Sequence, residues 1–586
     1  MKTYQIFLIV IIYFSSPKIN AQYFTKVITT SITTTPGDSR SVNWIDVNND
    51  GNIDLFISNG PNGGQNNFLF MNSGTGSFSL VSTDSITLDN SPSDGASFAD
   101  INNDGSIDAF VVNWYNQDNL FYTNDGDGTF TKNNGQIISN DAGYSETASW
   151  ADYDKDGLVD LYITNSAGAK KNYLYHNDGN ANFSKITIGG QVNDAYFSRN
   201  VSWVDMDADG DLDIFVTNEN NQNENIYRND GSEGFTKLTT GPLVNDAGNT
   251  NSSSWADIDN DGDLDVFLAN DLGFNALFMN NGDFNFSKII DDTVVKTPAR
   301  SFSSAWSDID NDGDLDLFVT NSFGTSLKQL NYLYINDGTG NFSRNAADVV
   351  ANDSSYSYGC AFGDYDNDGF EDLAVATCRF GSIDYENFLY HNNTNSNNWI
   401  TFKLTGTVSN KSAIGTKIRI RALINGIPTW QMREISSQSS YNGQNDLRVH
   451  FGIKGATTID SVKIEWPLGL IENYTSFSSN QFIEFVEGVG STNINKLNFK
   501  TNNKLVVYPN PSNGKITIRL QYEKLNTGSV IKIINTHGRA VFSTQLIDER
   551  DEICIDVTSL SIKAGVYYIL LERKSRENIF NKVMIW

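Results

Sequence analysis

The sequence contains few residues of the kinds on which most enzymes and nucleic-acid-binding proteins depend. Only 4 of its 586 residues are histidine, and 41 Lys and Arg are outnumbered by 70 Asp and Glu, which gives a net charge of −29. This acidity argues against nucleic acid or an anionic membrane as a partner. The sequence also has no nucleophile elbow, phosphate-binding loop or zinc triad, so we expect no catalytic site.

Cysteine is scarce as well, since three cysteines are too few for a disulfide scaffold. Cys360 and Cys378 lie on either side of one acidic loop, so an antiparallel hairpin would place them nearly opposite each other. A disulfide between them is compatible with an oxidising compartment. Two buried thiols fit the same pattern, and in either case Cys554 is predicted to be free.

The sequence also lacks a hydrophobic run long enough to cross a bilayer. The run at residues 6–14 is apolar throughout but short, whereas a transmembrane helix needs about 20 apolar residues. With Lys2 before it and Ala21 after it, this run is typical of a secretory signal peptide. We therefore expect residues 1–21 to be removed and the mature chain to have no transmembrane segment.

What the sequence has in abundance is one nine-residue phrase, D-x-[DN]-x-D-G-x-x-D, which occurs seven times. The copies begin at Asp46, Asp100, Asp152, Asp205, Asp257, Asp308 and Asp364. Successive copies start 54, 52, 53, 52, 51 and 56 residues apart. A nearly constant period of this length is typical of a repeat architecture, in which each repeat is one supersecondary unit.

Each copy has the composition of a calcium-binding loop. Ca²⁺ takes about six to eight oxygen ligands, and side chains at loop positions 1, 3, 5 and 9 can supply them together with the position 7 carbonyl. Glycine at position 6 allows the sharp turn. An EF-hand would need a glutamate at position 12, but position 12 is apolar in every copy: Ile57, Val111, Ile163, Val216, Leu268, Val319 and Val375.

The predicted calcium ligands come from positions 1, 3, 5, 7 and 9 of each loop, with one Ca²⁺ per repeat and up to seven in all. They are Asp46, Asn48, Asp50, Asn52 and Asp54; Asp100, Asn102, Asp104, Ser106 and Asp108; Asp152, Asp154, Asp156, Leu158 and Asp160; Asp205, Asp207, Asp209, Asp211 and Asp213; Asp257, Asp259, Asp261, Asp263 and Asp265; Asp308, Asp310, Asp312, Asp314 and Asp316; and Asp364, Asp366, Asp368, Phe370 and Asp372. Four positions in seven loops, with asparagine at two of them, give 26 carboxylates, so much of the negative charge is metal-binding capacity. Asn48 and Asn102 at position 3 predict weaker binding in loops one and two.

Apolar segments flank every acidic loop and predict strands. Segments such as Leu55–Ser58 and Ile214–Thr217 are short, β-branched and aromatic. Between the loops runs a second phrase, N-x-[LI]-[FY]-x-N-[DSN]-G followed by Phe, which predicts a strand, a tight turn and a strand. Four strands per repeat is the size of one propeller blade.

We therefore predict an all-β fold, with a seven-bladed β-propeller over residues 22–400. Tyr23–Val27 resembles the last strand of a repeat, such as Phe235–Leu238, and is expected to complete the seventh blade. A closed ring would leave few free strand edges. A linear array of calcium modules is the alternative.

The seven loops resemble the FG-GAP/VCBS repeats of integrin-type propellers, over residues 23 to about 400. The resemblance implies that calcium stiffens each blade and that recognition takes place elsewhere on the propeller faces.

After Trp399 the repeat ends, and residues 401–487 contain a different set of phrases. Ile414–Arg421 alternates apolar and basic residues, as in a half-exposed strand, and Leu447–Gly452 and Val462–Gly469 follow it. These phrases resemble the ASPIC/UnbV domain, which follows such repeats in proteins similar to cartilage acidic protein. The resemblance implies a small β domain of unassigned role.

Residues 488–503 are polar and predict a linker to a last domain at 504–586. Val507–Gly514 contains Y-P-N-P-x-x-G, and Ala564–Tyr568 is A-G-V-Y-Y. Together they resemble the type IX secretion C-terminal sorting domain of Bacteroidetes. This implies a β-sandwich that the type IX secretion machinery recognises and export across the outer membrane. An ordinary β-sandwich with a packing role is the alternative.

The sequence thus predicts a secreted or cell-surface, calcium-binding propeller that binds an extracellular glycan or protein ligand without catalysis. The alternative is a calcium-dependent carbohydrate-active enzyme, similar to the polysaccharide lyases built on propellers. His450 and Glu465 are the one acid–base pair that the second domain offers, but a packing histidine and a surface glutamate are the favoured interpretation.

Overall fold

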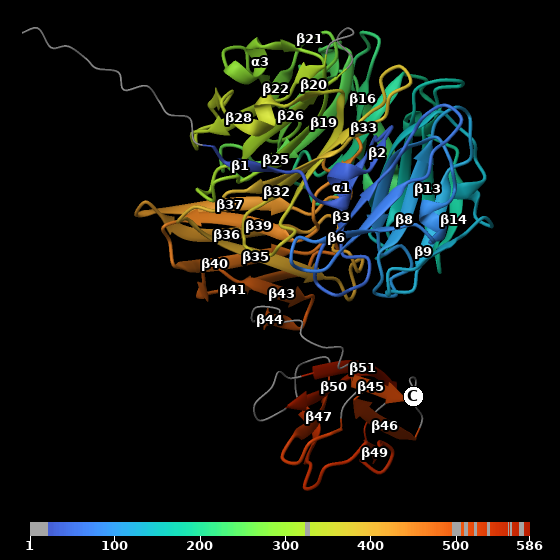
Figure 1. The fold of residues 1–586 in the computed structure, drawn as a ribbon, viewed down its shortest axis with the longest axis vertical. Helices are drawn as coiled ribbons and strands as arrows, with labels where there is room; N and C mark the ends of the chain where they lie inside the picture. Colours follow the sequence, from blue (N-terminus) through green and yellow to red (C-terminus); the bar gives the residue numbers. More distant parts are fainter. Residues whose placement is uncertain are drawn as a thin grey trace, which may run out of the picture.

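The computed structural model describes residues 22–322, 328–494 and, with short gaps, 505–585. The predicted signal peptide, 1–21, and residues 495–503 of the predicted linker lie outside the described residues. Within the described ranges the chain is almost entirely strands and connecting loops (Figure 1), which confirms the predicted all-β class. None of the helices in these ranges has the length and apolar character needed to cross a membrane.

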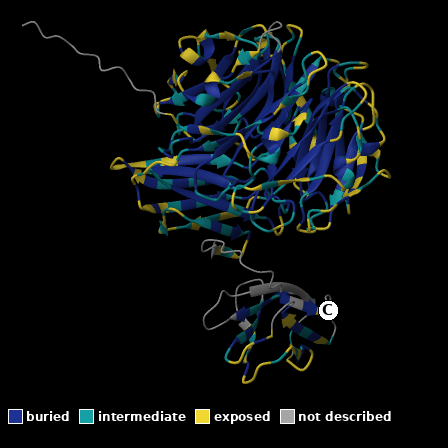
Figure 2. Ribbon diagram, viewed as in Figure 1, coloured by how far each residue is buried: buried dark blue, intermediate teal, exposed yellow. Residues whose placement is uncertain are grey.

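Seven blades of four antiparallel strands form the first part of the chain. From the inner to the outer strand, they are β3 (Val42–Ile45), β4 (Asp54–Ile57), β5 (Phe68–Asn72) and β6 (Phe78–Val81); β7 (Ser93–Ala99), β8 (Asp108–Asn113), β9 (Leu120–Asn124) and β10 (Phe130–Lys132); β11 (Ser145–Ala151), β12 (Asp160–Asn165), β13 (Tyr173–Gly179) and β14 (Asn182–Ile186); β15 (Ser198–Val204), β16 (Asp213–Asn218), β17 (Asn225–Asn229) and β18 (Phe235–Leu238); β19 (Thr250–Ala256), β20 (Asp265–Asn270), β22 (Ala276–Asn280) and β23 (Phe286–Lys288); β25 (Ser301–Ser307), β26 (Asp316–Asn321), β28 (Tyr332–Asn336) and β29 (Phe342–Arg344); and β31 (Ser357–Gly363), β32 (Asp372–Thr377), β34 (Phe388–Asn392) and β1 (Phe24–Val27). Each inner strand contacts the inner strands of both neighbouring blades, so the blades form a closed ring. The inner and second strands are buried on both faces (Figure 2), which explains their apolar composition.

The ring is closed by the first strand of the chain, as predicted from sequence. β1 pairs with β34 in antiparallel register, from Phe24 opposite Asn392 to Val27 opposite Leu389. Phe24 is fully buried in the core of the seventh blade. The two ends of the propeller therefore hold each other, and the seventh blade has four strands like the other six.

Short helical turns and small strand pairs connect successive blades. The turns that lead from one blade to the next are α1 (Ser31–Thr34), η1 (Ser85–Thr87), η2 (Ile137–Ser139), α2 (Gly190–Asn193), η4 (Leu243–Asn245), α3 (Thr293–Lys296) and α4 (Val349–Asn352), while η3 (Gly231–Glu233) lies within blade four. Each connecting turn buries at least one apolar side chain, such as Ile86 or Val294. β2 (Pro36–Gly37) pairs with β33 (Tyr385–Glu386), β21 (Gly273–Phe274) with β24 (Pro298–Ala299), and β27 (Gln329–Leu330) with β30 (Ser354–Ser355). Single bridges such as Gln65 to Ser91 join the other blades.

Cys360 and Cys378 are both free, so the disulfide between them, one of the two alternatives from sequence, is wrong. The predicted hairpin does form, but its register, set by Gly363 opposite Asp372, places Cys360 opposite Val375 and not opposite Cys378. The two thiols consequently belong to different apolar clusters. Burial raises the pKa of each of these thiols to about 12. Cys554 is free, as predicted.

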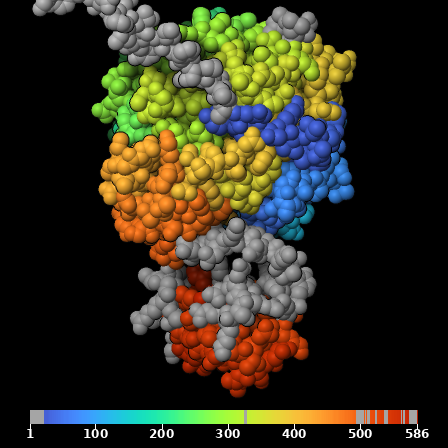
Figure 3. All heavy atoms as spheres, turned by 60° about the vertical axis from the view of Figure 1, so that its left-hand side comes forward, coloured from blue at the N-terminus to red at the C-terminus, as the bar shows by residue number. Residues whose placement is uncertain are grey.

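The second domain consists of two sheets packed face to face. One contains β39 (Val449–Lys454), β35 (Asn398–Thr405), β43 (Phe482–Val486) and β44 (Gly490–Ile494), and the other contains β37 (Ile427–Glu434), β36 (Lys417–Ile424), β40 (Thr458–Glu465), β41 (Ile471–Tyr474) and β42 (Phe477–Ser478). Ile418 and Ile420 of β36 are fully buried between the sheets with Phe402 and Phe451. Figure 3 shows this domain, in orange, directly against the propeller.

A loop of the second domain enters the centre of the propeller. We call residues 435–447, which connect β37 to β39, the plug loop. It includes β38 (Gly443–Gln444), which pairs in parallel with inner strand β3. Ser437 Oγ accepts the Trp150 N–H of blade three at 2.7 Å, and Gln444 Oε1 accepts the Phe98 N–H of blade two at 2.9 Å. The plug loop thus fills the channel. It also accepts hydrogen bonds from main-chain N–H groups of the inner strands that point into the channel, away from the other strands of their blades.

The tip of the plug loop reaches the far end of the channel. The Tyr441 hydroxyl lies 2.6 Å from Glu146 Oε2 and 2.9 Å from Asp94 Oδ2. These two carboxylates stand at the start of their inner strands, whereas the acidic loops follow the ends of those strands. The plug loop therefore extends through the ring from one face to the other.

The C-terminal domain is a β-sandwich, as predicted. One sheet contains β45 (Leu505–Tyr508), β46 (Lys515–Leu520) and β49 (Glu552–Asp556), and the other contains β48 (Ala540–Gln545), β47 (Val530–Asn535), β50 (Gly565–Glu572) and β51 (Ile579–Ile585). Its own core includes Ile516, Ile518, Ile531 and Ile569, all fully buried.

The fit of the plug loop predicts that Gly443→Ala will destabilise the propeller. A Cβ at this position would lie 2.3 Å from the main-chain oxygen of Cys360, which cannot move without disturbing inner strand β31. We expect a loss of about 1–3 kcal/mol in the free energy of unfolding, as is usual for overpacked cores. Gly455→Ala in the same domain, where a Cβ would meet nothing within 4 Å, is the control. Equal melting temperatures for the two variants would show that the loop is not packed as described.

Candidate metal centres

All seven acidic loops lie on one face of the ring, which we call the loop face. Each loop joins an inner strand to the second strand of its blade, so the topology places the loops at equivalent positions. The aspartate at position 9 begins the second strand in every blade: Asp54, Asp108, Asp160, Asp213, Asp265, Asp316 and Asp372. All seven are buried.

The position 9 carboxylate ties its loop to the third strand. In loop one, Asp54 Oδ2 accepts the Val47 N–H at 3.2 Å and Oδ1 accepts the Asn72 N–H at 2.7 Å. The same two bonds recur in the other six loops. This double role explains why the sequence has aspartate at position 9 without exception.

The carboxylates at positions 1 and 5 bend the loop around its own centre. Asp46 accepts the N–H groups of Asp50 and Gly51 at 3.0 and 2.9 Å, and Asp50 accepts the N–H of Asn52 at 2.8 Å. In loops three, four and five, carboxylate oxygens from positions 1, 3 and 5 all lie within 4.8 Å of one another. Leu158 and Phe370 at position 7 have no side-chain donor and offer only a main-chain carbonyl.

Buried oxygens without a hydrogen-bond partner show that the donor set fits a cation. Among the described residues, Asp205 Oδ1, Asp257 Oδ1 and Asp366 Oδ1 are such oxygens, and each belongs to position 1 or 3 of a loop. Buried acceptors are normally satisfied, and oxygen donors of this kind suit Ca²⁺. Burial, with the charges of Asp259 and Asp261 adding to it, raises the pKa of Asp257 to about 7.

Two loops also contain a nitrogen donor that the sequence analysis did not assign. His176 Nδ1, on β13, lies 3.1 Å from Asp160 Oδ1 and 3.2 Å from Asp154 Oδ2. His391 Nδ1, on β34, lies 3.1 Å from Asp372 Oδ1 in loop seven. The signal was available, because each histidine immediately precedes the second asparagine of the repeated strand phrase.

The second domain covers the loop face with basic side chains. Lys417 Nζ lies 2.6 Å from Asp205 Oδ2 of loop four, Lys454 Nζ lies 3.5 Å from Asp312 Oδ2 of loop six, and Lys403 Nζ lies 3.9 Å from Asp46 Oδ2 of loop one. Arg419 contacts the Gly262 carbonyl of loop five at 3.3 Å. The alternating basic residues of β36, expected to face solvent, therefore face the acidic loops.

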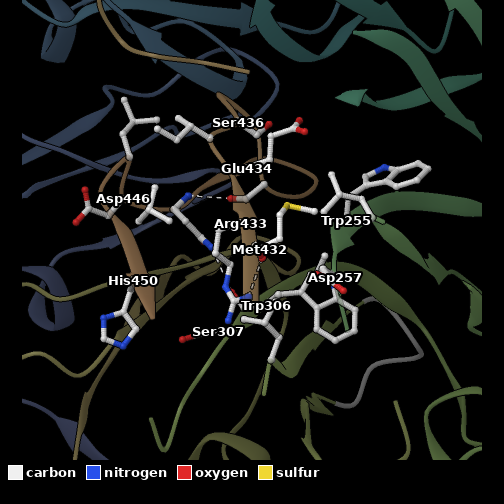
Figure 4. Close-up of a pocket in the computed structure, with 18 of the residues that line it drawn as sticks. Trp255, Asp257, Trp306, Ser307, Met432, Arg433, Glu434, Ser436, Asp446 and His450 are labelled. Carbon is white, nitrogen blue, oxygen red and sulfur yellow. Dashed lines mark hydrogen bonds between the residues drawn. The ribbon is translucent and has the colours of Figure 1, made fainter. Parts of the chain in front are cut away.

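A cavity of about 160 Å³ remains between the second domain and loops five and six. Figure 4 shows Arg433 inside it, near Trp306 and Asp257. Burial lowers the pKa of Arg433, although Asp308 and Asp257 act in the opposite direction. Burial raises the pKa of Glu434 to about 7. The net charge at this interface thus depends on Arg433 and Glu434 of the second domain and on the aspartates of loops five and six.

His450 and Glu465 have separate partners. His450 Nδ1 is 3.0 Å from Thr401 Oγ1, and its Nε2 is 2.6 Å from Asn311 Oδ1 of loop six. Burial lowers the pKa of His450 to about 3. Glu465 pairs instead with Arg419 and Lys463.

The opposite face, which we call the open face, presents a ring of seven equivalent positions around the channel. They are Arg40, Asp94, Glu146, Arg199, Asn251, Phe302 and Tyr358, each near the start of an inner strand. Arg199 Nη1 lies 2.8 Å from Glu146 Oε1, and the rings of Phe302 and Tyr358 lie 4.9 Å apart. These positions vary among the blades, with arginine at two of them, although the residues that build the blades repeat.

Family comparisons match all three parts of the chain. The FG-GAP-like repeat matches residues 46–111, 100–163, 152–216, 205–268, 257–319 and 308–375, the ASPIC and UnbV domain matches 406–492, and the secretion system C-terminal sorting domain matches 506–586. These matches confirm the three resemblances inferred from sequence.

Curated relatives match over part of their length. Cartilage acidic protein 1 of Mus musculus is 28% identical over 202 residues, covering 33% of this chain and 30% of the relative. The Xenopus tropicalis protein of the same name is 26% identical over 268 residues, covering 44% of this chain and 40% of the relative. The chain thus spans less than half the length of these relatives.

Solved structures give weaker likenesses. An Agrocybe aegerita lectin described as recognising non-reducing terminal N-acetylglucosamine has a TM-score of 0.40 and 17% identity, covering 62% of this chain and 91% of the lectin. PorZ of the Porphyromonas gingivalis type IX secretion system has a TM-score of 0.34 and 13% identity, covering 91% of this chain and 58% of PorZ. At these values the likenesses say nothing about function.

The carboxylate count of each loop predicts unequal effects of mutation. Asp261→Ala removes the position 5 ligand from a loop with four carboxylates, whereas Asp50→Ala does so in loop one, which has three. A site at 100 times its dissociation constant adds about 2.7 kcal/mol to folding stability. In calcium-saturated protein, we expect Asp261→Ala to lower the melting temperature more than Asp50→Ala. The reverse order would contradict a structural role for these ligands.

Stability should also depend on pH when calcium is chelated. Burial raises the pKa of Asp54, Asp108 and Asp265 to about 8, above the usual 3.8. The folded chain then holds protons that the unfolded chain releases, so stability falls as the pH rises between these values. Calcium binds the ionised carboxylates, so its effect on the melting temperature should be larger at about pH 8 than at about pH 5.5. Thermal scans at both pH values, with calcium and with chelator, measure this; an equal effect would contradict it.

Proposed function

The chain belongs to the FG-GAP-like repeat family, and from this premise we propose that it is a noncatalytic binding or adhesion protein for an extracellular glycan or protein. Calcium in the loops would hold the blades rigid. The C-terminal sorting domain indicates type IX export to the cell surface or the medium, which is where such a ligand would be met.

The observation that carries this proposal is that one face of the ring is covered and the other is open. The second domain occupies the loop face through Lys417, Arg419 and Lys454, and the plug loop fills the channel. A ligand therefore has access to the rims of the blades and to the open face.

The open face has exposed apolar side chains that could serve recognition. Around the channel, Glu146, Phe302 and Tyr358 are only 1%, 6% and 4% exposed, so the ring of equivalent positions is packed inside the protein and does not meet a ligand. Further out, the loops between second and third strands expose apolar side chains, with Tyr115 36% exposed, Leu272 65% and Phe274 59%. Exposed apolar side chains gathered on one face are typical of a binding surface.

The test is a glycan and matrix-protein array probed with the mature protein in calcium. We expect binding that the combined Tyr115→Ala and Phe274→Ala substitutions reduce at least about tenfold, as for apolar anchors at an interface. Ile427→Ala with Trp430→Ala, which alters side chains that are 66% and 44% exposed on the second domain, is the matched control and should bind normally. Equal loss in both double variants would contradict recognition by the open face.

Any ligand found should then be incubated with the protein and analysed for products. Recovery of the intact ligand supports a binding protein. Cleaved chains would instead support the calcium-dependent carbohydrate-active enzyme, and the search for a lysine or arginine base would begin among the residues around the bound ligand.

A further inference from the structure

We propose that loops three and seven are transition-metal centres, in which an imidazole nitrogen from the third strand joins two loop carboxylates. The donors are Asp154, Asp160 and His176 in blade three, and Asp366, Asp372 and His391 in blade seven. The ligand is a divalent ion that accepts nitrogen, of the Zn²⁺ or Co²⁺ class. The inference rests on the cation-binding role proposed for the loops but assigns a different ion to two of them.

The positions of the donor atoms fit such an ion. His176 Nδ1 lies 3.1 and 3.2 Å from the two carboxylate oxygens of its group. His391 Nδ1 lies 3.1 and 3.6 Å from those of its group. In each group one atom from each residue lies within 4.8 Å of the other two. Donors bound at about 2.0–2.2 Å to one Zn²⁺ are separated by about 3.0–3.5 Å.

The surroundings of the two histidines also fit metal ligation. Of the two Asp366 oxygens, Oδ2 is the one nearest His391 Nδ1, and the other oxygen of the same carboxylate, Oδ1, is buried without a hydrogen-bond partner. The Asp160 and Asp372 side chains are fully buried, while the two imidazoles are 26% and 32% exposed. Asp178 Oδ1 lies 3.7 Å from His176 Nε2, on the outer side of the ring, where metal-bound histidines commonly have a carboxylate.

The internal repeat distinguishes these two loops from the other five at two positions. At loop position 7 the other five loops have polar side chains, namely Asn52, Ser106, Asp211, Asp263 and Asp314. Loops three and seven have Leu158 and Phe370 there. The strand position of the two histidines is occupied in the other blades by Met71, Thr123, Arg228, Met279 and Ile335. The loops with an apolar position 7 are thus the same two that have a histidine.

The added imidazole changes the preferred ion. Carboxylate and carbonyl oxygens suit Ca²⁺, whereas imidazole favours Zn²⁺ and its neighbours in the first transition row. Five blades therefore have oxygen-only loops for calcium, and two have mixed nitrogen and oxygen donors.

The test measures both metals in the same protein. Full-length mature protein is equilibrated with excess Ca²⁺ and micromolar Zn²⁺, freed of unbound ions and subjected to elemental analysis. We expect about two Zn²⁺ per chain, about one after His176→Met or His391→Met, and none after both substitutions. Methionine is the residue of blades one and five at this position, so the variants should fold. Ile335→Met in blade six is the control and should leave the zinc content unchanged.

Replacing Zn²⁺ with Co²⁺ gives a second readout, because visible absorption bands of bound Co²⁺ report nitrogen ligation and should disappear in the double variant. Zinc content that the double variant retains, or a wild-type content near zero, would overturn the inference. The second result would mean that a protonated imidazole serves as the counter-charge. Calcium is counted separately, so its absence from the other five loops would contradict the proposed function without affecting the zinc result.

Discussion

Repulsion among carboxylates gathered on one face of the ring is the constraint on which the rest of the structure depends. Each loop brings three or four of them together, and in loops three to five oxygens from three residues lie within 4.8 Å of one another. Two like charges at 4 Å repel by about 4 kcal/mol at an effective dielectric constant of 20. When these carboxylates are ionised, seven such loops need nearby positive charge to offset their repulsion in a folded ring. We infer two sources of compensation, namely ions bound by the loops and the basic side chains of the second domain.

The second domain therefore has a physical role in the propeller. Lys417 lies 2.6 Å from a loop carboxylate and the plug loop bonds to the inner strands, so the domain is held both by charge and by main-chain hydrogen bonds. The Tyr441 hydroxyl extends this contact to Glu146 on the open face. One connection between two strands of the second domain thus links the loop face, the channel and the surface that we propose for recognition.

The repeated part of the fold could be predicted from sequence because its signals recur. The period of the acidic loops, the two strand phrases and the resemblance of Tyr23–Val27 to a last strand were enough to predict the ring and its closure. Features that occur once or twice could not be found in this way. The sequence around Ser437 and Gln444 is that of an ordinary polar loop, and their bonds to the inner strands appear only in the folded ring. The basic residues of β36 contact acidic loops that are distant in the sequence. Cys360 lies opposite Val375 and not opposite Cys378 because the hairpin pairs from Gly363 and Asp372 outward, and this starting pair becomes visible only in the structure. A single histidine in a strand does not indicate a metal site. His176 and His391 become informative only as equivalent positions of two blades.

The central claim is that cation binding in the loops, together with the second domain, keeps the ring folded. The most direct test is to titrate calcium into chelated full-length protein while following the melting temperature and the hydrogen exchange of the plug-loop amides. The account predicts that the melting temperature rises until the loops are saturated and that the plug-loop amides gain protection over the same calcium range. A melting temperature and an exchange rate that do not change, with no bound metal by elemental analysis, would contradict it.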